Sequence, residues 1–116
     1  MNAAAGVLKA GVKASDVFTA ARQVLIEAKT MPAVEMVGHG IGLDIHEPPS
    51  LDANNDMALQ EGMTICIEVW LIDENWRSKG GGGLYGYEDI FVVKEDGYEL
   101  IEGLDHSIIK VDHPIL

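Results

Sequence analysis

Hydrophobic residues recur at every third or fourth position after Ser15, a spacing that is typical of an amphipathic helix. The recurring positions are Val17, Ala21, Val24, Leu25 and Ala28. Ser15 is a residue type that often caps the start of a helix, and Pro32 should end it because the residue before a proline is displaced from the helical conformation. We therefore predict a helix over residues 16–29. Residues 2–9 resemble the tail of an earlier helix.

After Pro32 the hydrophobic pattern changes to a period of two, which indicates strands. The predicted strands are Ala33–Val37, Leu43–Glu47, Met63–Ile72, Tyr87–Val93 and Glu99–Glu102. Between them, the predicted loops and turns are Pro48-Pro49, Asp52–Asp56, the glycine run Lys79–Gly83 and the hairpin turn Glu95-Asp96-Gly97. One helix followed by antiparallel strands predicts the α+β class. We expect the helix to cover a curved sheet, with Val17, Val24 and Leu25 packed against Ile65, Ile67 and Leu71.

Glu68 lies in the middle of the most hydrophobic predicted strand. Ile65, Ile67 and Val69 share one face, whereas Cys66, Glu68 and Trp70 share the other. A carboxylate in such a strand is costly to desolvate unless it is paired or bound to a cation. A comparable glutamate, Glu88, begins the strand Tyr87–Val93. A salt bridge is the alternative explanation for each glutamate, and it is weakened by the small number of basic residues, 8 in the chain.

The segment from Gly38 to His46 places two histidines close together in the sequence. Three glycines surround His39 and allow backbone and ligands to approach its imidazole. Alternation along the predicted strand puts Asp44 and His46 on its polar face. A single histidine beside glycine is more often a hydrogen-bonded structural residue. The two histidines border one cleft, and two strand glutamates plus one histidine make half of a binuclear metal site, with manganese, iron, cobalt or zinc as suitable ions.

The charge and cysteine content exclude several classes of function. The chain has 19 acidic and 8 basic residues, a formal net charge of −11, which disfavours binding to nucleic acid or to an anionic membrane surface. Cys66 is the only cysteine, so no intrachain disulfide can form. No signal peptide or membrane-spanning segment is indicated, and we expect a single globular domain over residues 1–116 in the cytoplasm.

Several motifs, taken in order, resemble the pita-bread metallopeptidases, which include methionine aminopeptidase, aminopeptidase P and prolidase, with creatinase as a non-peptidase relative. The motifs are Gly38–Gly42, His46-Glu47-Pro48, Leu59–Met63 leading into Ile67-Glu68, and Tyr87-Glu88-Asp89 leading into Val92-Val93 and the following hairpin. The resemblance covers nearly the whole chain and implies the C-terminal half of that fold. It implies that His39, Glu68 and Glu88 bind divalent metal, with two ions in the complete family site and manganese as the expected ion. Glu68 would also transfer protons, and His46 would contact the substrate.

The resemblance further implies hydrolysis of bonds that precede proline, with two cations activating water. Two departures concern substrate class: Val69 replaces a proline that commonly follows the glutamate, and Gly86 stands where prolidase-like members often have arginine. We also expect two aspartate ligands and a histidine of the family to lie upstream of this chain. A non-catalytic binding or dimerisation module, and a hydrolase or lyase for a small non-peptide substrate, are alternatives. A homodimer would cover the surface that the missing half should cover.

Overall fold

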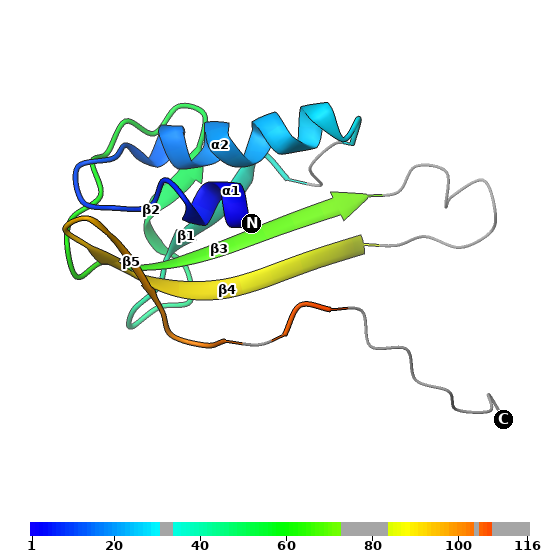
Figure 1. Cartoon of the computed structure of the whole chain (residues 1–116). Helices are drawn as coiled ribbons and strands as arrows, with labels where there is room; N and C mark the ends of the chain where they lie inside the picture. Colours follow the sequence, from blue (N-terminus) through cyan, green and yellow to red (C-terminus); the bar gives the residue numbers. More distant parts are fainter. Residues whose placement is uncertain (31–33, 73–83, 104, 108–116) are drawn as a thin grey trace, which may run out of the picture.

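The computed structural model describes residues 1–30, 34–72, 84–103 and 105–107. Two helices lie over one face of a five-stranded antiparallel sheet (Figure 1). The helices are α1 (Asn2–Ala5) and α2 (Ala14–Glu27), and the strands are β1 (Met36–Gly40), β2 (Glu47–Asp52), β3 (Thr64–Ile72), β4 (Leu84–Lys94) and β5 (Gly97–Leu100). The strand order is β2-β1-β3-β4-β5. The predicted α+β class, with a helix packed on a curved antiparallel sheet, is confirmed.

Helix α2 begins two residues earlier than predicted, and Ser15 does not cap it. Its N-cap residue is Lys13, which makes no capping hydrogen bond through its side chain. The free N–H groups of the first turn instead donate to the chain that precedes β3: Ala14 N donates to Met57 O at 3.0 Å and Ser15 N to Asn55 O at 2.9 Å. Tertiary contacts therefore satisfy the donors that a side-chain cap usually satisfies.

The hydrophobic core lies between the helices and the sheet. Its fully buried side chains come from the helices, from the segment that joins them and from the helix-facing side of the strands, and include Leu8, Val17, Val37, Leu51, Ile65, Ile67 and Val93. The expected burial of Ile65 and Ile67 with Val17 is confirmed. Val24, in contrast, is 48% exposed, and Leu71 is only half-buried, so these two expected contacts were wrong. The reason is that α2 packs on β2 and β1, away from the far half of β3.

The strand predicted over Leu43–Glu47 was also wrong. The residues after β1 form a loop in which Leu43 and Ile45 are largely exposed, and β2 starts only at Glu47. β2 contains Pro48 and Pro49, although we predicted a loop there. β2 is an edge strand of the sheet, where proline is tolerated because one side of the strand has no hydrogen-bonding partner.

Strands β3 and β4 form the longest pairing of the sheet, from Thr64 opposite Val92 to Ile72 opposite Leu84. The hairpin turn predicted at Glu95-Asp96-Gly97 is confirmed, because β4 pairs with β5 directly across it. The predicted glycine-rich loop Lys79–Gly83 lies outside the described residues. In the described part of the chain, no helix is long and apolar enough to cross a membrane.

Candidate metal centre

His39 lies on the sheet face that points away from the core. In the pairing of β1 with β3, His39 is opposite Cys66, and Gly38 is opposite the buried Ile67. Cross-strand partners project from the same face of a sheet, so His39 shares its face with Cys66 and Glu68. The strands come very close at Gly38, where an added Cβ would lie 2.1 Å from the carbonyl oxygen of Cys66. The predicted close approach of backbone around His39 is therefore present.

The imidazole of His39 is oriented by a hydrogen bond through one ring nitrogen and faces a carboxylate with the other. Its Nδ1 lies 2.9 Å from the carbonyl oxygen of Gly40, and its Nε2 lies 3.3 Å from Oε1 of Glu68. A carbonyl can only accept, so Nδ1 carries the proton and donates it to Gly40. Metal-binding histidines commonly donate their second N–H to a backbone carbonyl in this way. The arrangement leaves Nε2 as the nitrogen that faces Glu68 and can bind a cation.

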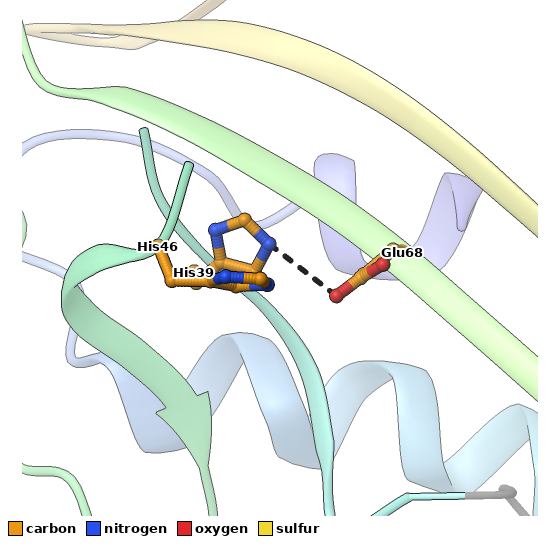
Figure 2. Close-up of side chains that lie close together, drawn as sticks. All are labelled: His39, His46 and Glu68. Carbon is orange, nitrogen blue, oxygen red and sulfur yellow. Dashed lines mark ion pairs between the residues drawn. The ribbon is translucent and has the colours of Figure 1, made fainter. Parts of the chain in front are cut away.

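His46 reaches the same position from the loop between β1 and β2, and not from a strand as predicted. Its ring centroid lies 4.3 Å from that of His39, with the two rings tilted by 55°. Figure 2 shows the two imidazoles side by side, with the Glu68 carboxylate directed toward them from β3. His39 is buried, Glu68 is partly buried and His46 is exposed. The group is thus closed toward the core and open toward solvent.

Glu68 has a second hydrogen-bonding partner that the sequence analysis did not assign. The indole Nε1–H of Trp70 donates to Oε2 of Glu68 at 2.8 Å, while Oε1 faces His39. The only signal in the sequence was that Trp70 and Glu68 share one face of their strand. Glu68 therefore has a hydrogen-bond donor on one carboxylate oxygen, and its other oxygen faces His39.

Glu88 lies beside this group without being part of it. Its Cα is paired with that of Glu68 across β3 and β4, which puts both glutamates on the same face. The Sγ–H of the buried Cys66 donates to Oε1 of Glu88 at 3.1 Å. Burial, the hydrogen bond to Glu88 and the nearby negative charges raise the pKa of the Cys66 thiol, so this cysteine remains a neutral donor.

Taken together, one ligand atom each from His39, His46 and Glu68 lie within 4.8 Å of one another. Two imidazole nitrogens and a carboxylate oxygen are a suitable donor set for a divalent transition metal. Three of the four residues named from the sequence are thus brought together. Glu88 is brought to their edge. The fold and this side-chain group therefore describe an α+β protein with a candidate divalent-metal centre on its sheet.

Comparison with known proteins identifies the family. Residues 1–95 match the model of metallopeptidase family M24, and the chain belongs to this family. It is 38% identical over 111 residues to the "Probable dipeptidase PepE" of Mycobacterium tuberculosis, covering 94% of this chain and 28% of that protein. It is 32% identical over 107 residues to the Xaa-Pro dipeptidase of Lactobacillus helveticus, covering 91% of this chain and 27% of the relative.

The fold is also similar to those of solved structures of peptidases. An X-Pro aminopeptidase from Thermotoga maritima superposes with a TM-score of 0.81 and 30% identity, over 95% of this chain and 30% of that one. The chain thus spans between a quarter and a third of the length of these relatives. The resemblance to the pita-bread metallopeptidases, made from the sequence motifs, is confirmed.

Proposed function

We propose that residues 1–116 form one C-terminal piece of the catalytic domain of a metal-dependent Xaa-Pro aminopeptidase or dipeptidase-like hydrolase. The observation that carries this proposal is the convergence of His39, His46 and Glu68 from a strand, a loop and a second strand. The names of the relatives support the substrate class, since they are dipeptidases and Xaa-Pro peptidases.

In this proposal His39, Glu68 and Glu88 bind divalent metal, with manganese as the preferred ion. A bound cation acts as a Lewis acid on water and on the peptide carbonyl. Nε2 of His39 and Oε1 of Glu68, which face each other at 3.3 Å, would hold the ion, and the Glu68 carboxylate would also move a proton. The exposed ring of His46 would contact the substrate, because it lies on the solvent side of the same group.

Three protein ligands are few for two cations, each of which takes about four to six donors. We therefore propose that residues 1–116 alone bind divalent metal weakly and hydrolyse Xaa-Pro peptides poorly or not at all. Oxygen ligands from the remaining two thirds or more of a family member would complete the site. This is in keeping with the share of the relatives that the chain spans.

The remaining expectations concern assembly and location. We propose a homodimer, because large apolar side chains are exposed on α2 and on β4, among them Val24, Ile26, Tyr85 and Tyr87. We propose the cytoplasm as the location, because the buried Cys66 is a free thiol. Light scattering tests the homodimer: a monomer of 12.5 kDa at micromolar concentration would contradict it.

The metal proposal is tested by titrating the chain with Mn²⁺ and recording NMR spectra of the histidine rings. We expect selective paramagnetic broadening at His39 and His46, and its loss in Glu68→Ala. Broadening spread evenly over the acidic surface, and unchanged in Glu68→Ala, would overturn the site. A parallel assay with a proline dipeptide tests completeness: enzyme-like turnover that disappears in Glu88→Ala would show that residues 1–116 suffice.

A further inference from the structure

Trp70 lies flat against β4 at Gly86, its partner across the sheet. The two residues are paired in the β3–β4 register. A Cβ added at Gly86 would lie 2.4 Å from Cε3, 2.6 Å from Cδ2 and 2.7 Å from Cζ3 of the indole. Contacts below 3.0 Å are not tolerated between real side chains, so only glycine at position 86 leaves room for the ring where it lies.

The packing of the ring against Gly86 determines the direction of the indole N–H. From its place on Gly86, Trp70 directs Nε1–H back along its own strand to Oε2 of Glu68, at 2.8 Å. The other oxygen, Oε1, is left facing Nε2 of His39 at 3.3 Å. The carboxylate is thereby fixed with one oxygen occupied by the indole and one oxygen free for the metal group.

We propose that Trp70 and Gly86 act as a positioning pair that holds Glu68 with only Oε1 presented to His39 and His46. A carboxylate with one oxygen engaged by a strong N–H donor binds a metal through a single oxygen. Residues that orient metal ligands in this way typically change metal affinity by about 10- to 100-fold when they are removed. The proposal rests on the proposed function for the role of Glu68 as a metal ligand, but the orientation itself exists without metal.

The pair also accounts for the residue at position 86. Prolidase-like members of the family often have arginine there, as noted from the sequence. In this chain any side chain at position 86 would collide with the indole of Trp70. The glycine and the tryptophan therefore form one coupled feature.

The experiment uses metal-free protein and the indole N–H of Trp70 as a spectroscopic probe. Trp70→Phe keeps a ring over Gly86, removes the donor and assigns the Trp70 signal among the two tryptophans. We expect the indole N–H to exchange with solvent at least about 10-fold more slowly than in free tryptophan. This protection should be lost in Gly86→Ala and in Glu68→Ala but retained in Gly97→Ala, where an added Cβ meets no atom within 4 Å.

Protection that is absent in wild type, or that persists in Gly86→Ala, would overturn the positioning pair. A titration with Mn²⁺ then measures its consequence: Trp70→Phe should need about 10-fold more Mn²⁺ than wild type to broaden the His39 ring signals. Equal Mn²⁺ requirements in the two proteins would also overturn the positioning role. Protection of the indole N–H without any broadening in wild type would leave the pair intact and contradict the proposed metal function.

Discussion

Glu68 and Glu88 lie directly opposite each other on the antiparallel strands β3 and β4. Like charges in this relation destabilise a sheet by about 0.2–1 kcal/mol. We expect Glu88→Gln to raise the free energy of unfolding of the metal-free protein by an amount in this range, because it removes the repulsion and keeps an acceptor for Cys66. Urea denaturation measures the change. Glu35→Gln is the control for net charge, since Glu35 is exposed, and an equal effect in both variants would contradict the explanation.

Gly38→Ala should disrupt the approach of β1 to β3. The new Cβ would lie 2.1 Å from the carbonyl oxygen of Cys66, and backbone atoms there cannot move without breaking the strand pairing. The φ angle of Gly38, +155°, is also one that side chains rarely adopt. We expect a loss of about 2–4 kcal/mol in unfolding free energy, within the range of severe single substitutions. Gly97→Ala is the matched control and should change the stability by less than about 0.5 kcal/mol.

Two valines on α2 provide a direct test of how the helix is oriented. Val17 is completely buried, whereas Val24, two turns later, is 48% exposed. Val17→Ala should cost about 1–2 kcal/mol because it removes buried methyl groups from the core. Val24→Ala should cost far less. Thermal or urea unfolding of the two variants measures the difference, and equal losses would mean that the C-terminal part of α2 packs on the sheet as closely as its N-terminal part.

Asp52 makes stability depend on pH in the acidic range. The hydroxyl of Ser50 and the backbone N–H of Asn54 donate to its carboxylate and hold the pKa of Asp52 below its ordinary value. A carboxyl whose pKa is lowered by folding adds stability above its unfolded pKa, about 3.9, and loses it as the pH falls through the folded pKa. Ser50→Ala should therefore be less stable than wild type at pH 7, and the difference should shrink below about pH 4.

The fold was predictable where one residue pattern decides the structure. The alternation along Met63–Ile72 correctly separated the buried Ile65 and Ile67 from the face of Glu68. The start of α2 was not predictable, because its first N–H groups are satisfied by Asn55 and Met57, forty residues away in the chain. The strand at Pro48 was missed for a related reason: proline is accepted there only because β2 is at the edge of the sheet.

The candidate site was predictable in its residues but not in its geometry. His39 and Glu68 could be named from their neighbours, and the structure places their side chains 3.3 Å apart. The loop that carries His46 has an alternating pattern that imitates a strand, although nothing covers Leu43 or Ile45. The role of Trp70 depends on the residue across the sheet, and no pattern within a single strand identifies a cross-strand partner.

During folding, the group of His39, His46 and Glu68 can form only after β1 has paired with β3. His39 and His46 belong to one hairpin and Glu68 belongs to another, and the whole of β2 separates them in the sequence. Closing such a loop costs more chain entropy than forming a hairpin turn, and non-local pairings slow folding. Neither hairpin holds all three side chains of this group before the two have docked. A newly synthesised chain is thus kept from capturing metal through this trio until its sheet is assembled.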